Sequence, residues 1–210
     1  FVDELFAGAP RHGAVLLAAL FPRSYIDPNR SLCDLDAALL DAPWPDPLEP
    51  SERTRLGQGL IWYTCPPDLQ IYKRKLSEAE VRKRIDDYYL AYHSTLDTSL
   101  KRLHRRFGHV WHINCHSMPA FGVATSPSGR RVQRAEFVLG DRDGTTCEPE
   151  FTALIREALE NFGYSVRINS PYKGVELVRA YSDPDDGRHS IQIEISRALY
   201  MDEMTFEQTN

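Results

Sequence analysis

The sequence has 210 residues, of which 42% are hydrophobic and 26% charged, a composition sufficient for one globular domain with an apolar core. Its 25 lysines and arginines stand against 30 acidic residues, a net charge of −5, so a basic nucleic-acid face is not expected. The apolar runs are too short to cross a membrane. The four cysteines are far apart and include no CxxC pair, so neither a disulfide scaffold nor a cysteine zinc site is expected. This cysteine usage predicts a location in the reducing cytoplasm.

The first thirty residues predict two short elements. Apolar residues at helical spacing predict that residues 1–8 are the end of a helix, which Gly8 and Pro10 terminate. The apolar run 14–20 predicts a short buried strand, because Gly13 and Pro22 bound it. The sequence begins at Phe1 and not at a methionine, and no signal peptide accounts for this start. We therefore expect the sequence to be a piece of a longer polypeptide.

A proline-rich segment precedes the clearest helix. Residues 41–68 hold six of the fourteen prolines and predict a long stretch without regular structure, either a functional lid or an ordered surface insertion. Ser77 then opens a capping box, in which its hydroxyl accepts from the Glu80 amide and Glu80 reaches back. Apolar residues at steps of three and four follow, so one amphipathic helix is predicted from Ser77 to Gly108.

The second half of the chain alternates strand and helix patterns. Strands are predicted over 109–115, 135–139, 164–168, 175–181 and 190–195, and a helix over 149–162. Strands that alternate with long helices indicate an α/β fold with at least partly parallel pairing.

Two imidazoles and an amide share one face of the strand predicted over 109–115 and its continuation. Strand alternation places His112, Asn114 and His116 on that face. His116 follows the strand end, where ligands bind in open α/β sheets, and is therefore a candidate metal ligand or acid–base group. A hydrogen-bonded structural histidine is the alternative, and spacing alone favours that alternative.

A carboxylate lies within the last predicted strand. Three isoleucines share one face of the segment 189–196, while Gln192, Glu194 and Ser196 share the other. A buried carboxylate is costly unless it is paired, and such a group often serves as a general base. A structural ion pair between Glu194 and Arg197 or another arginine is equally consistent with the pattern.

Two cationic segments are weaker signals. Arg23 and Arg30 flank a turn, and an arginine beside Asn29 suits bidentate recognition of a carboxylate. Lys173 and Arg179 lie near a second turn and are candidates for anion binding. Taken singly, the first segment is more consistent with a surface turn, and the second is a weak signal.

Taken together and in this order, these segments resemble the N-formylglutamate amidohydrolase family. The matching stretches span nearly the whole chain: RSYIDPNR (23–30), KRKLSEAEV (73–81), HINCHSMP (112–119), FVLGDRDG (137–144), SPYKGVELVRAY (170–181) and GRHSIQIEISRALYMDE (187–203). The resemblance implies a single α/β domain over residues 1–210: a three-layer α/β/α arrangement with a central mixed sheet, of the phosphorylase/hydrolase-like, zinc-carboxypeptidase-like kind. It also implies that the N-terminal strand segment and the C-terminal tail of this domain are lacking from the sequence.

The resemblance further implies an activity and a set of roles. Family members hydrolyse the formyl amide of N-formyl-glutamate to formate and glutamate, a zinc-dependent step of histidine breakdown. The implied roles are His116 as metal ligand, Glu194 as general base, Arg23 as oxyanion stabiliser, Asn29 and Arg30 as the pair that holds the substrate carboxylate, and Lys173 and Arg179 as lining of the same pocket.

The metal ligands depart from the family pattern. The first ligands of the family lie upstream, in a Pro-His-Ser-Gly type motif with an acidic residue beyond it. This sequence has no such segment, so the remaining zinc ligands are expected upstream of Phe1. Asn114 also stands where many members have Asp. A catalytic zinc needs about three protein ligands, of which only His116 is assigned; His112 and His189 are the histidines that could substitute.

The sequence thus predicts a cytoplasmic, zinc-dependent amidohydrolase that acts on a small acidic N-acyl amino acid, without a nucleic-acid or membrane partner and with no oligomeric state implied. One alternative is a carboxypeptidase-like metallopeptidase, which needs an open groove, whereas the segment 41–68 favours a closed pocket for a small molecule. The other alternative is a non-catalytic domain of the same fold that binds carboxylates through its arginines.

Overall fold

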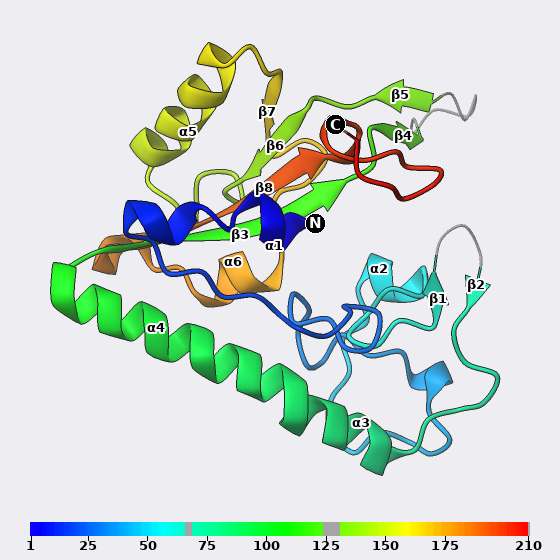
Figure 1. The fold of residues 1–210 in the computed structure, drawn as a ribbon. Helices are drawn as coiled ribbons and strands as arrows, with labels where there is room; N and C mark the ends of the chain where they lie inside the picture. Colours follow the sequence, from blue (N-terminus) through cyan, green and yellow to red (C-terminus); the bar gives the residue numbers. More distant parts are fainter. Residues whose placement is uncertain (66–68, 124–130, 210) are drawn as a thin grey trace. The chain divides into compact units, whose positions relative to one another are not determined.

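The computed structural model describes residues 1–65, 69–123 and 131–209, which form two compact units (Figure 1). The sheet unit comprises residues 1–12, 103–174 and 178–210. The loop unit comprises residues 13–102 and 175–177. The expectation of a single domain over 1–210 stays a prediction.

A mixed four-stranded sheet forms the centre of the sheet unit (Figure 1). Its strands lie in the order β3 (Val110–Met118), β8 (Arg188–Ser196), β6 (Phe137–Gly140) and β7 (Val166–Ile168). β3 is parallel to β8 and β6 is parallel to β7, whereas β6 and β8 are antiparallel. The predicted α/β class with a central mixed sheet is therefore confirmed.

The two faces of this sheet differ in polarity. One face carries Ile191, Ile193 and Ile195 of β8, and helix α5 (Pro149–Asn161) contributes apolar side chains to the same core cluster. Burial of one such isoleucine contributes about 1.5–3 kcal/mol. The opposite face of β8 carries Gln192 and Glu194, because alternate residues of a strand point to opposite sides.

The loop unit packs irregular chain against one long helical stretch. Helix α3 (Glu78–Arg84) continues through a π-helical turn, η3 (Ile85–Leu90), into α4 (Ala91–Phe107), whose last residues belong to the sheet unit. Ser77 caps α3 as predicted, since its Oγ accepts from the Glu80 amide at 3.3 Å. The Glu80 carboxylate also accepts from the Arg74 guanidinium on both of its oxygens, at 2.7 and 2.8 Å.

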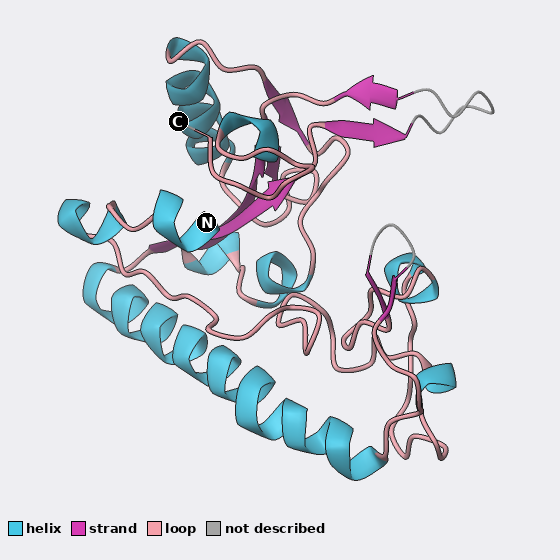
Figure 2. Cartoon of the chain, turned by 45° about the vertical axis from the view of Figure 1, so that its right-hand side comes forward, coloured by secondary structure: helices cyan, strands magenta, loops and turns pink. Residues whose placement is uncertain are grey.

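Short elements complete the described structure, and Figure 2 shows how much of the chain between helices and strands is loop. They are α1 (Val2–Leu5), η1 (Ala9–His12), η2 (Ala37–Leu39), α2 (Glu52–Arg55), β1 (Thr64–Cys65), β2 (Leu69–Gln70), β4 (Phe121–Val123), β5 (Arg131–Gln133), α6 (Glu176–Ala180), η4 (Pro184–Asp186) and η5 (Arg197–Leu199). The segment predicted to lack regular structure, 41–68, contains only α2 and β1 among its described residues, and its residues 66–68 lie outside the description.

Two predicted strands are wrong. The run 14–20 joins no sheet, and its apolar side chains include Val15 and Leu20, which are 51% and 96% exposed, so it has neither the pairing nor the burial of a strand. The segment 175–181 is mostly the helix α6. The neighbours Leu177 and Val178 are both buried, whereas an extended strand would point them to opposite sides.

Candidate functional site

The polar face of the sheet brings together side chains from two parallel strands. The register pairs His112 with Ser190, Asn114 with Gln192 and His116 with Glu194. Partners in register point to the same side of a sheet, so these six side chains form two adjacent rows on one face. We call this surface the β3–β8 polar face. It confirms the predicted alternation in both strands.

The Glu194 carboxylate is buried on this face and receives a hydrogen bond from its own strand. Gln192 Nε2 donates to Glu194 Oε1 at 2.8 Å, and the two residues are 2% and 7% exposed. The bond orients the carboxylate from the neighbouring position of the same row. Arg197, the suggested structural partner, donates from its Nε to Ser117 Oγ at 3.3 Å.

The three histidines considered as metal ligands lie at different places on the sheet. His112 and His116 share the polar face, but four residues of strand separate them by about 13 Å. Ligands of one zinc ion each lie about 2 Å from it, so these two histidines do not share an ion. His189 pairs with Trp111 on the opposite face, where its Nδ1 accepts from the Glu148 amide at 3.3 Å. His189 therefore does not stand beside His116.

The donor set for a metal is incomplete among the described residues. In the ranges 1–65, 69–123 and 131–209, no group of three or more His, Cys, Asp or Glu side chains is arranged to hold a metal ion. His116 contributes one nitrogen ligand at most, whereas a catalytic zinc site takes about three protein ligands. The residues described thus do not fit a complete zinc site by themselves.

His112 is held as a neutral imidazole. Burial lowers its pKa to about 4, and its Nδ1 lies 2.8 Å from Ser190 Oγ. Its ring also meets Tyr181 edge-on, with ring centroids 6.3 Å apart. These contacts give His112 a structural environment on the polar face.

A turn approaches the same face at Gly140, the register partner of Gln192. A side-chain carbon on Gly140 would lie 2.6 Å from the main chain of Lys173, so only glycine admits this close approach. The Lys173 main chain thus lies against the sheet, while its ammonium group extends to the Asp143 carboxylate at 2.7 Å. Arg179 lies on α6 and is exposed.

The loop unit builds a second cluster of chemistry-bearing residues around one buried carboxylate. Asp27, only 1% exposed, accepts from Arg23 Nε at 3.2 Å and from Arg23 Nη2 at 2.7 Å. It also accepts from the main-chain N–H of Asn29 at 3.0 Å and from Trp62 Nε1 at 3.4 Å. The Arg23 side chain is 43% exposed, and its Nη1 donates to no described residue. We call the segment 23–30, which surrounds this carboxylate, the Asp27 turn.

The two residues predicted to hold a substrate carboxylate lie in the same turn. Asn29 Oδ1 accepts from the Leu177 amide at 2.9 Å. Arg30 is 6% exposed, and it donates from Nε to the Gln58 carbonyl and from Nη1 to its neighbour's carbonyl. Its Nη2 donates to no described residue, and burial lowers the pKa of the guanidinium. One nitrogen of Arg30 therefore keeps its donors for a ligand.

The surroundings of the turn fix its main chain. Tyr89 donates from its hydroxyl to the Arg30 carbonyl at 2.9 Å, and His93 Nε2 lies 2.9 Å from the Pro28 carbonyl. The rings of Tyr89 and His93 stack at 4.0 Å. The turn is therefore a rigid, buried structure and not the surface turn that composition alone favours.

The predicted site residues thus fall into two groups. His116, Glu194, Lys173 and Arg179 belong to the sheet unit, whereas the other three belong to the loop unit. Sequence analysis missed Asp27, although its place two residues before Asn29 is a signal of an Asx turn. It gave no signal for Trp62, which lies 35 residues further along the chain.

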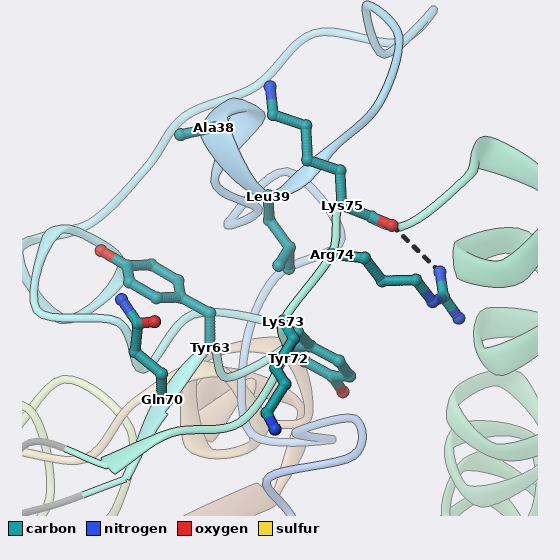
Figure 3. A pocket seen from close by; sticks show the side chains of 8 residues that line it. All are labelled: Ala38, Leu39, Tyr63, Gln70, Tyr72, Lys73, Arg74 and Lys75. Carbon is teal, nitrogen blue, oxygen red and sulfur yellow. Dashed lines mark hydrogen bonds between the residues drawn. The ribbon is translucent and has the colours of Figure 1, made fainter.

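A pocket of about 350 Å³ lies in the loop unit, apart from every predicted site residue. Its lining consists of Ala38, Leu39, Tyr63, Gln70, Tyr72, Lys73, Arg74 and Lys75. Figure 3 shows the Arg74 side chain extending away from the two tyrosines, with its guanidinium bonded to the Lys75 carbonyl at 3.0 Å. The lining has no carboxylate or imidazole for acid–base chemistry.

Known proteins match the chain over nearly its full length. The model of the N-formylglutamate amidohydrolase family matches residues 1–201. The N-formylglutamate deformylases of Pseudomonas putida and Pseudomonas aeruginosa are each 28% identical over 205 residues, which is 96% of this chain and 70% of theirs.

A solved structure also matches the fold. The crystal structure of an N-formylglutamate amidohydrolase from Ralstonia eutropha JMP134 has a TM-score of 0.93 and 50% identity, covering 100% of this chain and 75% of that one. Among the described residues, no helix combines the length and the apolar character needed to cross a membrane. The fold, the order of the motifs and the family match together show that this chain belongs to the N-formylglutamate amidohydrolase family.

Proposed function

We propose that this protein hydrolyses the formyl amide of N-formyl-L-glutamate, or of a similar acidic N-formyl amino acid, to formate and the free amino acid. The observation that carries the proposal is the buried Glu194 carboxylate, oriented by Gln192 on the face that also holds His116. The relatives named for this activity, at 28% and 50% identity, support the choice of substrate.

Glu194 acts as the general base in this reaction. It takes a proton from a water molecule, and the resulting hydroxide attacks the formyl carbon. Glu194 then delivers the proton to the nitrogen of the leaving amine as the C–N bond breaks. The bond from Gln192 to Oε1 orients the carboxylate on the polar face. General acid–base catalysis of this kind contributes about 10²–10⁴-fold.

The arginines of the Asp27 turn provide positive charge. Arg23 stabilises the oxyanion that forms on the formyl oxygen, and Asp27 fixes the direction of its guanidinium through two hydrogen bonds. Arg30 and Asn29 hold a carboxylate of the substrate, with Arg30 Nη2 as the donor that the fold leaves over. Lys173 and Arg179 provide further positive charge for binding of the acidic substrate.

Zinc dependence is part of the proposal, with His116 as a ligand. A bound zinc would polarise the formyl carbonyl and acidify a water molecule. The described residues form no group of three ligands, so the roles above are assigned to side chains alone. The first measurement is the zinc content of the unaltered, intact protein, and replacement of His116 by Ala should abolish that zinc binding. An unchanged zinc stoichiometry in that variant would refute the assignment.

The test of the activity is formate release from N-formyl-L-glutamate by the purified, zinc-supplemented protein. N-acetyl-L-glutamate and a dipeptide with a C-terminal glutamate serve as comparison substrates. We expect formate release from N-formyl-L-glutamate to be faster than cleavage of N-acetyl-L-glutamate or of the dipeptide. Faster cleavage of the dipeptide would favour the carboxypeptidase-like alternative, and binding of N-formyl-L-glutamate without turnover would favour a carboxylate-binding domain.

A cellular context follows from the substrate. We place the enzyme in the cytoplasm and in histidine breakdown, where N-formyl-glutamate is the substrate of the family's reaction. All four cysteines are free thiols, which is usual in a reducing compartment. Cell fractionation followed by detection of the protein tests the location.

A further inference from the structure

Asn114 on the β3–β8 polar face has a buried side-chain nitrogen, Nδ2, without a hydrogen-bond partner among the described residues. The residue is 6% exposed, and its Nδ2 is one of two buried side-chain polar atoms in the described residues that make no hydrogen bond. Other groups on this face are satisfied: His112 meets Ser190, and Gln192 donates to Glu194. The missing bond is therefore a property of Asn114 alone within this row.

An unsatisfied buried donor is unfavourable for the folded state. Leaving such a group without a partner typically costs about 1–3 kcal/mol, and native proteins contain few of them. An apolar residue of similar shape would avoid this cost at the same position. Since Asn114 stands in the middle of the regular strand β3, the local backbone does not require an asparagine.

The position of Asn114 indicates what the missing partner is. It is the register partner of Gln192, and the next pair along the same face is His116 with Glu194. The Glu194 carboxylate accepts hydrogen bonds, so it takes the O–H of the attacking water. The Asn114 amide donates hydrogen bonds, so it takes an oxygen acceptor beside that water.

We propose that Asn114 is a substrate-binding residue, whose side-chain NH₂ donates a hydrogen bond to the formyl oxygen of the substrate as the C–N bond is hydrolysed. This inference rests on the proposed function and extends it by one residue. The donor is unsatisfied in the free protein and gains its acceptor when the formyl group binds. Because charge accumulates on that oxygen in the transition state, the bond strengthens there.

The test uses Asn114→Leu and Asn114→Val in the purified, zinc-supplemented protein. Leucine has the same number of side-chain heavy atoms as asparagine, and valine is smaller should the leucine methyls be too bulky. Thr152→Val is the matched control, because Thr152 is buried in the same unit and donates to Asp141 Oδ2 at 3.0 Å. Melting temperature, kcat and KM on N-formyl-L-glutamate, and inhibition by the product L-glutamate are measured.

We expect the melting temperature of at least one Asn114 variant to equal or exceed that of the unaltered protein, while kcat falls on the order of 10²-fold. Inhibition by L-glutamate, which lacks the formyl oxygen, stays unchanged. Thr152→Val shows the opposite pattern, a melting temperature lower by a few degrees with nearly normal kcat.

Two outcomes would overturn the inference. Normal kcat in a folded Asn114 variant removes the role in catalysis, and a loss of melting temperature in both variants as large as that of Thr152→Val shows a structural asparagine. The proposed function fails separately, if the unaltered protein releases no formate. In that case the role of Asn114 falls with it.

Discussion

The β3–β8 polar face and the Asp27 turn present their functional side chains by different physical means. On the sheet, strand alternation and parallel register set the positions of His116 and Glu194, so neighbouring rows follow directly from backbone geometry. In the turn, no regular ladder exists, and a single buried carboxylate collects donors from Arg23, Asn29 and Trp62.

This difference predicts how each region responds to substitution. A functional side chain on the sheet is separable from the fold, because the backbone ladder persists when the side chain changes. A functional side chain in the Asp27 turn is not separable, because the hydrogen bonds that orient it are also the bonds that hold the turn. Substitutions of the catalytic side chains on the sheet should therefore lower activity without lowering stability, and those in the turn should lower activity and stability together.

The largest expected effect is on the sheet. Glu194→Gln keeps the shape of the side chain and removes its basicity, so kcat should fall about 10²–10⁴-fold. The melting temperature should stay close to that of the unaltered protein. Steady-state kinetics and thermal denaturation check both values, and a variant that unfolds would show that the carboxylate is structural.

A smaller effect is expected for Arg30→Ala in the turn. Removal of a charged hydrogen-bonding partner of the substrate typically costs about 2–5 kcal/mol in kcat/KM. The loss should be specific to N-formyl-L-glutamate and should disappear for a formamide that has no carboxylate. Arg30 Nε also lies 3.7 Å from Asp34 Oδ2. Equal losses of kcat/KM on both substrates would therefore mean that Arg30 serves only the fold.

Asp27→Asn should combine a loss of stability with a loss of activity. The amide NH₂ that replaces Oδ2 cannot accept from Arg23 or Trp62, and hydrogen bonds to charged groups contribute about 1.5–3 kcal/mol each. We expect a lower free energy of unfolding in urea and a kcat reduced about tenfold or more. Asp36→Asn, at an exposed cap of η2, is the matched control and should change neither. An Asp27 variant with normal stability contradicts the comparison.

The smallest effect is a pH dependence of stability that originates on the sheet. Folding lowers the pKa of His112 from 6.5 to about 4, so the unfolded state binds the proton first as the pH falls. Stability is unaffected above pH 6.5 and is lost between pH 6.5 and 4, by about 3 kcal/mol at most.

Urea denaturation at several pH values checks this dependence in the unaltered protein and in His112→Gln. Between pH 6.5 and 4, the free energy of unfolding of His112→Gln should fall by less than that of the unaltered protein. His12→Gln, which removes an exposed histidine of η1, should behave like the unaltered protein. Identical pH profiles for all three proteins would remove His112 from the explanation.

The contrast between the two regions also explains what could be predicted from the sequence. Alternation in the segment 189–196 and around His116 predicted the polar face, because a period of two is visible in single residues. Burial of the Asp27 turn was not visible, because it depends on Trp62, Tyr89 and His93, which lie far away in the sequence. The run 14–20 was misread for the same reason, since its apolar composition does not reveal whether another strand pairs with it.

The most direct test of the account follows the oxygen of the attacking water. The protein, in excess over N-formyl-L-glutamate, completes a single turnover in H₂¹⁸O, and the formate and the Glu194 carboxylate are analysed by mass spectrometry. If Glu194 is a general base, the first formate released carries one ¹⁸O and Glu194 carries none. Unlabelled formate from the first turnover, followed by ¹⁸O in Glu194, would show direct attack by the carboxylate and contradict the account.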